Sequence, residues 1–242
     1  MIASLITTYN RPWFLERTIH GIVALGARVL VVDDGSDPEL AEKNKNICDM
    51  ARPEAIGDVV YMRLPENRGL AASLSIGLDF WLVDNDISHI SYFQDDVAVD
   101  PLLHRVLLDV SKALPHRILL TGHDAQEHRI NKTIQVTGHD IKVSSKASCR
   151  ATHMFAHRDS WKSVMPIKSK GIGFPRGGEG SNVDWWITRD HPKPLPVWCV
   201  PGLVRTFAWK AEDSCWGNKQ VTGNDNELSR DAIRGGKFYD RC

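Results

Sequence analysis

The sequence predicts an α/β fold of Rossmann-like type, with a mostly parallel central sheet, helices on both faces and a single domain. Strand-like and helix-like segments alternate through the first hundred residues, which is the pattern of a parallel sheet. The run "RVLVV" (residues 28–32) is almost entirely apolar, as expected of a strand covered on both faces. Each early strand also ends in a short polar loop, and ligands bind at that edge of open α/β sheets.

Apolar spacing and turn residues place the individual elements. Strands are expected at residues 2–7, 28–32, 58–64, 89–93 and 197–204, with short strands near 132–136. Helices are expected to start at Pro12 and Pro38, because proline suits the first helical position, and Asp37 can cap the second. Further helices are expected over residues 70–81, 101–114 and 183–190, and a glycine-rich loop over 171–180.

Composition is that of a soluble globular protein, with 242 residues, 42% hydrophobic and 25% charged. No apolar run approaches the roughly 20 residues of a membrane span, so we expect no transmembrane segment and no signal peptide. The five cysteines are scattered and include no C-x-x-C pair. That usage fits a reducing compartment, and we expect a cytoplasmic protein. We see no linker and expect one domain, with a nucleotide-binding half at residues 1–101 and an acceptor-binding half at residues 102–242.

Charge is unevenly distributed, although 30 basic residues balance 30 acidic ones. Residues 1–100 carry 8 Lys and Arg against 16 Asp and Glu, whereas residues 101–176 carry 13 against 5. The basic middle block is either an ordinary solvated surface or a binding surface for an anionic partner such as nucleic acid.

Asp95 and Asp96 are adjacent carboxylates directly after the fourth predicted strand, in "YFQDDVAVDP". Two neighbouring negative charges repel, so a positive partner is expected beside them. Carboxylates at a strand end suit Mg²⁺ or Mn²⁺, with phosphate oxygens completing the coordination. The alternative is that the pair caps the helix near Pro101 or is simply solvated.

Four segments resemble the GT-A glycosyltransferases, especially those of family 2, in their order and approximate spacing. They are "SLITTYNRPWFLERTI", "VLVVDDGSD", "ENRGLAASLSIGL" and "YFQDDVAVDP", and they cover about residues 2–101. The resemblance implies a nucleotide-sugar pocket lined by Thr8, Tyr9, Asn10, Arg11, Asp34, Asn67, Arg68, Gly69 and Asp95. Asp34 would bond the base, most often uracil, and residues 67–69 would border the donor phosphates or sugar.

The same resemblance implies a metal motif in which Asp96 is the main ligand and Asp95 lies nearer the ribose. Two departures weaken it: Gln94 replaces the first acidic residue of many relatives, and Thr206 stands where many have a histidine. The positive partner of the acidic pair is therefore expected to be the metal with a nucleoside diphosphate.

The general base of an inverting transfer is expected in "EGSNVDWWITRD". Asp184 is the preferred base and Glu179 the reserve, since Ser181 and Asn182 replace the acidic pair of relatives. Asp184 is equally explained as a first-turn carboxylate stabilised by the helix dipole.

The predicted function is a metal-dependent glycosyltransferase of hexosyltransferase type that uses a nucleoside diphosphate sugar, UDP-sugar first, and Mn²⁺ or Mg²⁺. The acceptor is a hydroxyl of a glycan or a modified nucleic acid. One alternative is a non-catalytic sugar-nucleotide or carbohydrate-binding module, which is favoured by Gln94, by Thr206 in place of a histidine, and by Ser181 and Asn182 in place of the acidic pair. The other is a nucleotidyltransferase, but the loop "TTYNRP" lacks the glycines that such enzymes need.

Overall fold

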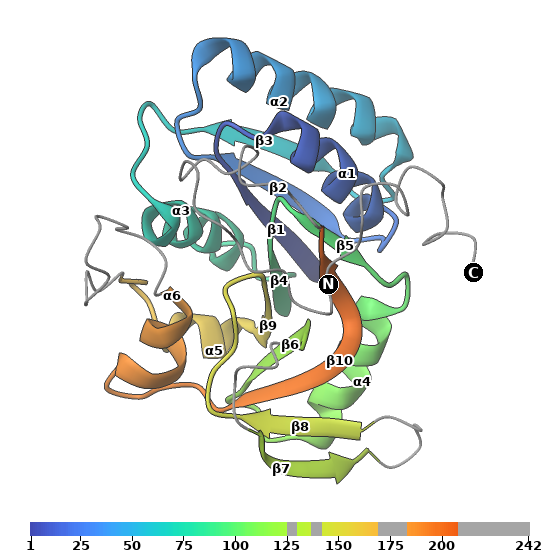
Figure 1. The fold of residues 1–242 in the computed structure, drawn as a ribbon, viewed down its shortest axis with the longest axis vertical. Helices are drawn as coiled ribbons and strands as arrows, with labels where there is room; N and C mark the ends of the chain where they lie inside the picture. Colours follow the sequence, from blue (N-terminus) through green and yellow to red (C-terminus); the bar gives the residue numbers. More distant parts are fainter. Residues whose placement is uncertain (125–129, 137–141, 169–182, 208–242) are drawn as a thin grey trace.

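The computed structural model describes residues 1–124, 130–136, 142–168 and 183–207. These residues form one mixed sheet in the order β3-β2-β1-β4-β9-β6-β10-β8-β7, with β5 paired to β10 (Figure 1). The strands are β1 (Ile2–Thr8), β2 (Arg28–Asp33), β3 (Val59–Arg63), β4 (His89–Gln94), β5 (Val97–Val99), β6 (Leu119–His123), β7 (Ile130–Gln135), β8 (Lys142–Lys146), β9 (His153–His157) and β10 (Val197–Thr206). The helices are α1 (Pro12–Val23), α2 (Pro38–Ala51), η1 (Arg52–Glu54), α3 (Leu70–Leu82), α4 (Leu103–Ala113), α5 (Arg158–Lys162), α6 (Val183–Trp185) and the π-helical η2 (Trp186–Asp190).

The parallel arrangement predicted for the first four strands is confirmed. Strand β1 pairs in parallel with β2 and with β4, and β2 pairs in parallel with β3. Beyond β4 the sheet becomes mixed, because β9 runs antiparallel to both β4 and β6. Antiparallel neighbours need no crossover helix, which matches the irregular, helix-poor sequence after residue 114.

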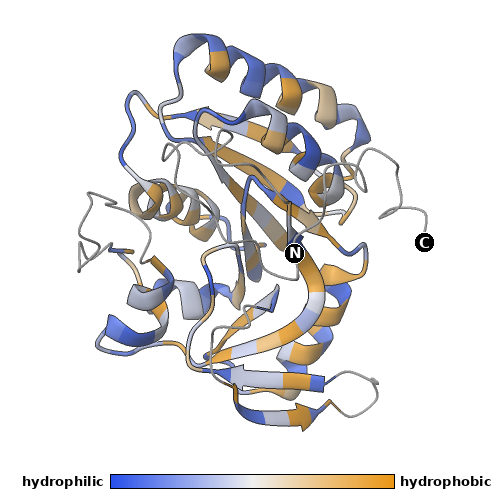
Figure 2. Ribbon diagram, in the orientation of Figure 1, coloured by the Kyte–Doolittle hydropathy of each residue, from blue (hydrophilic) through white to orange (hydrophobic). Residues whose placement is uncertain are grey.

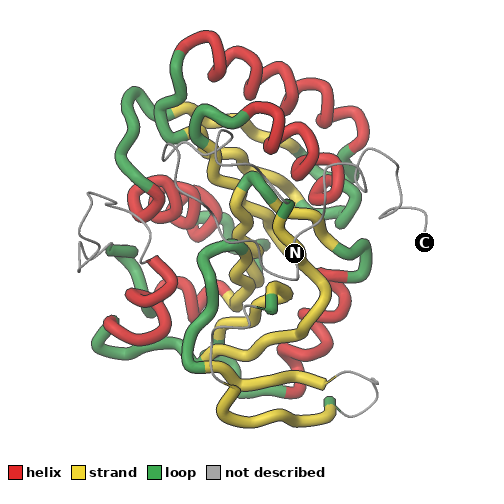
Figure 3. The backbone as a smooth tube through the Cα atoms, in the orientation of Figure 1, coloured by secondary structure: helices red, strands yellow, loops and turns green. Residues whose placement is uncertain are grey.

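Two hydrophobic clusters cover the two faces of the sheet, with helices on both sides (Figure 3). Alternate residues of β2 enter different clusters: Val29 and Val31 pack with α1, α2 and α4, whereas Leu30 and Val32 pack with α3 and α5. Burial on both faces explains the uninterrupted apolar strands, which are largely orange in Figure 2. Both clusters join residues from before and after residue 101, so the single-domain prediction is confirmed.

Two predicted helices differ from those observed. The helix expected over 101–114 begins at Leu103, and the one expected over 183–190 divides into α6 and η2. Asp37 is the N-cap residue of α2 as predicted, but its side chain makes no capping hydrogen bond. Its carboxylate instead accepts a bond from Asn10 Nδ2 at 3.2 Å, since the two loops lie against each other.

None of the helices in the described part of the chain is both long and apolar enough to cross a membrane. The three cysteines within that part, Cys48, Cys149 and Cys199, are buried free thiols.

Gly35 lies in the turn after β2 at a position that no larger residue fits. Its φ is +74°, and a Cβ placed there would lie 2.2 Å from the backbone carbonyl carbon of Glu66. We expect Gly35→Ala to cost about 3 kcal/mol of unfolding free energy, because a left-handed conformation costs roughly 1–2 kcal/mol and overpacking adds to it. Gly202→Ala is the matched control, since its φ is +86° but no described atom lies within 4 Å of its Cβ.

Urea unfolding of both glycine variants separates the two costs. Gly202→Ala is expected to lose only about 1–2 kcal/mol, the conformational part. Equal losses of unfolding free energy in the two variants would show that the backbone at Glu66 moves away from the added Cβ without a loss of stability.

His104 in α4 is a buried histidine with no hydrogen-bond partner for either ring nitrogen among the described residues. Burial lowers its pKa from 6.5 to about 4. His153 in β9 is fully buried, and burial with two neighbouring histidines holds its pKa well below the usual value. Both imidazoles are therefore neutral in the folded protein, packed against Phe93.

The unfolded chain takes up protons at these histidines near pH 6.5, but folded His104 does so only near pH 4. Stability is thus expected to fall as the pH falls through this window, by up to about 3 kcal/mol for His104. His104→Leu should flatten the dependence of unfolding free energy on pH between 6.5 and 4, whereas His116→Leu, at an exposed histidine, should not. A slope that is identical in wild type and His104→Leu would contradict the assignment.

Candidate active site

The carboxyl ends of β1, β2 and β4 meet at one edge of the sheet. In the strand register Thr8 lies opposite Asp33, and Thr7 lies opposite Gln94. The loops that follow these strands therefore lie side by side, as the predicted topology requires. The loop before α3 joins them, because Arg68 N donates to Asp34 Oδ1 at 2.9 Å.

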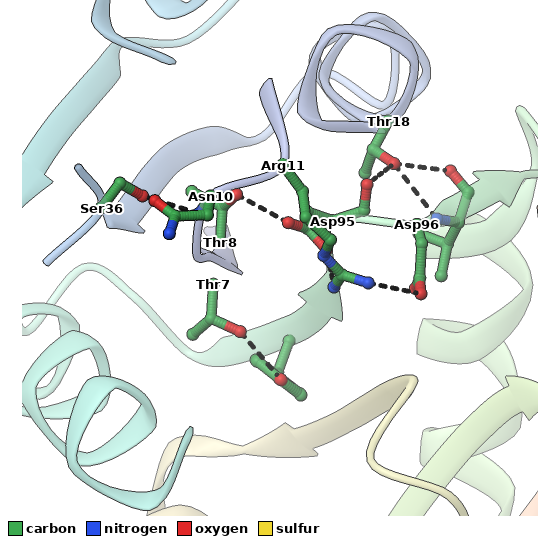
Figure 4. Close-up of polar contacts among 10 residues, drawn as sticks. Thr7, Thr8, Asn10, Arg11, Thr18, Ser36, Asp95 and Asp96 are labelled. Atoms are coloured by element: carbon green, nitrogen blue, oxygen red, sulfur yellow. Dashed lines mark hydrogen bonds and ion pairs between the residues drawn. The ribbon is translucent and has the colours of Figure 1, made fainter. Parts of the chain in front are cut away.

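Asp95 is completely buried at the centre of this edge. Its Oδ2 accepts a 2.6 Å hydrogen bond from Thr8 Oγ1, and its Oδ1 contacts the guanidinium of Arg11 (Figure 4). Burial raises the pKa of the Asp95 carboxyl to about 6, and the negative charge of Asp96 acts in the same direction. Arg11 and Thr8 oppose that rise by stabilising the ionised form.

Asp96 has two carboxylate oxygens in different settings. Oδ2 lies 3.4 Å from Arg11 Nη1, whereas Oδ1 is buried and has no hydrogen-bond partner among the described residues. The backbone is fixed at the same point, because Phe207 N donates to the Asp96 carbonyl at 2.8 Å. Thr206 pairs with Val97 and therefore lies next to the acidic pair. It occupies the position at which the family resemblance implies a histidine.

Arg11 is the positive partner that the acidic pair requires within the protein itself. The sequence led us to expect a metal with a diphosphate in that role, but the guanidinium contacts both carboxylates. Arg11 is the N-cap residue of α1, and its Cζ lies 5.5 Å from the centre of the Phe14 ring. Its expected place beside the nucleotide stays a prediction.

A divalent cation fits this site through Asp96. The buried Oδ1, without a partner among the described side chains, is an anionic oxygen of the kind that Mg²⁺ and Mn²⁺ prefer. Within the described ranges no group of three or more His, Cys, Asp or Glu side chains could hold a metal. A cation on Asp96 would therefore need further oxygen ligands from phosphate or water.

Asn10 joins the first two loops of the edge. It has a φ of +55°, a conformation that asparagine tolerates better than most residues. Its backbone N donates to Ser36 Oγ, and its Oδ1 accepts from Asp37 N, each at 2.8 Å. Tyr9, immediately before it, is half-buried. Asn10 thus holds the loop after β1 against the loop after β2. Its expected contact with the nucleotide sugar stays a prediction.

Asp34 is buried and anchors the loop before α3. Burial raises the pKa of its carboxyl, while hydrogen bonds from Arg68, Ser73 and Gly69 act against that rise. Gly69 has a φ of +80° and is the N-cap residue of α3, and Asn67 Oδ1 accepts a bond from its N at 3.1 Å.

Asp33 has a turn role, because its Oδ1 accepts a 2.8 Å bond from Ser36 N. Its Oδ2 accepts from Asn44 and from the Tyr61 hydroxyl, so it is a structural residue.

Asp184 lies in α6, within the cluster on the α3 face of the sheet. It is buried, and the pKa of the Cys149 thiol is raised mainly by burial of that thiol and secondarily by the negative charge of Asp184. The segment that follows Cys149 reaches the edge described above, since Gln94 N donates to the carbonyl of Thr152 at 3.0 Å. Glu179, Ser181, Asn182 and the glycine-rich loop lie outside the described residues, so the choice of base stays a prediction.

Thr18 is a site residue that the sequence reading missed. Its hydroxyl lies 2.8 Å from the Asp95 carbonyl and 3.1 Å from Val97 N, so α1 fixes the turn that carries both carboxylates (Figure 4). The available signal was a polar residue on the buried face of a predicted helix, between Leu15 and Ile19.

The sheet and its acidic edge together are of the GT-A type. A family model described as glycosyl transferase family 2 matches residues 4–162, and the chain therefore belongs to glycosyl transferase family 2. No protein of curated function matches the chain in sequence.

Solved structures resemble the fold at low sequence identity. HddC from Yersinia pseudotuberculosis has a TM-score of 0.51 at 11% identity, over 85% of this chain and 93% of that one. TarS (residues 1–349) from S. aureus has a TM-score of 0.49 at 13% identity, over 70% of this chain and 50% of that one. The mannosyltransferase PcManGT from Pyrobaculum calidifontis, in complex with GDP-Man and Mn²⁺, has 0.40 at 17% identity, over 51% and 35%. The chain thus matches only half of TarS and about a third of PcManGT.

Proposed function

We propose that the chain transfers a sugar from a nucleoside diphosphate sugar, UDP-sugar first, to an acceptor hydroxyl, with inversion and with the aid of Mn²⁺ or Mg²⁺. The observation that carries this proposal is the buried Asp95–Asp96 pair at the carboxyl edge of the parallel strands. One Asp96 oxygen has no hydrogen-bond partner among the residues that the structure describes. Family membership supports it independently.

The proposal assigns a role to each loop at this edge of the sheet. Asp96 would hold the cation, with Asp95 beside it, and a bound cation would neutralise charge on the diphosphate as it leaves. The segment from Thr8 to Arg11 and the loop at residues 67–69 would border the donor, and Asp34 would recognise the base. Asp184, or Glu179 in reserve, would take the proton of the acceptor hydroxyl.

The acceptor is either a glycan or a modified nucleic acid. That the transferred sugar is a hexose also stays a prediction. The division into donor and acceptor halves at residue 101 and the cytoplasmic location also stay predictions. The basic middle block makes an anionic acceptor testable, because its binding would weaken steeply with added salt.

The test is donor binding and donor hydrolysis by the wild-type chain across UDP-, GDP- and TDP-sugars, with and without Mn²⁺. Binding and Mn²⁺-stimulated hydrolysis of one donor would support the proposal. Binding without hydrolysis, also in the presence of a broad acceptor panel, would identify a non-catalytic sugar-nucleotide module. No binding of any donor would overturn the proposal.

A further inference from the structure

Arg11, Asp95 and Asp96 form a charge cluster in which the chain supplies its own cation. We propose that Arg11 is an internal counter-ion that competes with a divalent cation for Asp96 until a nucleoside diphosphate binds. The guanidinium contacts Asp95 Oδ1 and lies 3.4 Å from Asp96 Oδ2, and the side chain is only 17% exposed. This inference rests on the proposed function, because it concerns the same site.

The position of the guanidinium is built into the loop between β1 and α1. The Asn10 backbone N donates to Ser36 Oγ (Figure 4). Its side chain accepts from Asp37 N, and the two bonds fix the loop directly before Arg11. The Phe14 ring, one turn into α1, lies under the Arg11 guanidinium at 5.5 Å. Asn10 and Phe14 thus position Arg11 over the two carboxylates independently of Asp95 and Asp96.

The electrostatics make Arg11 and a lone divalent cation competitors. Both would share the Asp96 carboxylate, the guanidinium at Oδ2 and the cation at Oδ1, which has no hydrogen-bond partner in the described part of the chain. Two cations a few ångströms apart in a largely buried site repel strongly, because the local dielectric constant is low. The single negative charge of Asp96 cannot offset that repulsion, and Asp95 already contacts the guanidinium.

A nucleoside diphosphate changes this balance. Its negative charges offset the repulsion, and its oxygens match the planar donor pattern of a guanidinium, which can then turn from Asp96 to phosphate. Cation and nucleotide should therefore each raise the affinity for the other, as thermodynamic linkage requires. Arg11 would in this way suppress cation binding to an empty donor site.

The test measures Mn²⁺ binding by the full chain without nucleotide, using electron paramagnetic resonance of free Mn²⁺. We expect Arg11→Gln to bind Mn²⁺ about 10-fold more tightly than wild type, because the competing charge is gone. Arg11→Lys, which keeps the charge, should stay near wild type. Arg105→Gln, at an exposed arginine of α4, is the matched control and should bind as wild type does.

Mn²⁺ affinity in folded Arg11→Gln that is equal to or weaker than in wild type would overturn the inference, and so would a lack of Mn²⁺ binding in both. If Arg11→Gln does not fold, the double variant Arg11→Gln/Asp95→Asn removes the ion pair as a unit and leaves the net charge of the cluster unchanged. It should then bind Mn²⁺ at least as tightly as wild type, because no guanidinium shares the Asp96 carboxylate, and weaker binding would overturn the inference.

A second titration adds UDP and GDP. Nucleotide should raise Mn²⁺ affinity more in wild type than in Arg11→Gln. If neither nucleotide binds, the donor proposal fails, while the measurement with Mn²⁺ alone still decides the role of Arg11.

Discussion

Replacing Asp96 with asparagine is expected to lower donor turnover by about 100-fold or more and to remove its stimulation by Mn²⁺. An amide of the same shape carries no charge, and the buried position of Oδ1 would then offer a cation a much weaker ligand. The measurement is the rate of donor hydrolysis as a function of Mn²⁺ concentration.

Asp86→Asn provides the matched control for this change. Asp86 is exposed and precedes β4, whereas Asp96 follows that strand, so the two carboxylates lie at opposite ends of it. It should keep wild-type turnover. Mn²⁺-stimulated turnover that survives in Asp96→Asn would show that Asp96 holds no cation. The two substitutions at the charge cluster should also act in opposite directions, since Asp96→Asn weakens Mn²⁺ binding and Arg11→Gln strengthens it.

Replacing Asp184 with asparagine is expected to lower sugar transfer by about 10²- to 10⁴-fold while donor binding is kept. An amide cannot accept the proton of the acceptor hydroxyl, whereas it fills the same buried space in α6. The measurement is the rate constant for transfer, together with the donor dissociation constant and the dependence of the rate on pH. Loss of the acidic limb of that pH dependence would mark the loss of a base.

Asp190→Asn is the matched control, because Asp190 is the last residue of the helical segment that has Asp184 in its first turn. It should retain full transfer. A stable Asp184→Asn with wild-type transfer would show that Asp184 is not the base and move the search to Glu179. A fall in stability with unchanged rate would support the first-turn carboxylate reading instead.

Local patterns were sufficient for the architecture of the first hundred residues. The apolar run of β2 and the proline starts of α1 and α2 depend on short-range physics, namely burial of alternate strand residues and the fixed φ of proline. Parallel pairing then brings the strand ends together, so the acidic edge follows from the element order. The same reasoning could not order β9, β6 and β10, because short antiparallel strands can pair in several ways.

The sequence by itself determined the alternating fold, the acidic pair at the end of β4 and the polar loops around it. Only the tertiary structure decided which side chains meet there. Arg11 reaches Asp95 across 84 positions of the chain. Asp34 binds the backbone of Arg68 across 34. Such contacts depend on loop dihedrals, such as the left-handed φ of Asn10, that are set by partners on other loops. No local pattern encodes the direction of a loop side chain, so the sequence did not predict that the Arg11 guanidinium contacts both carboxylates of the acidic pair.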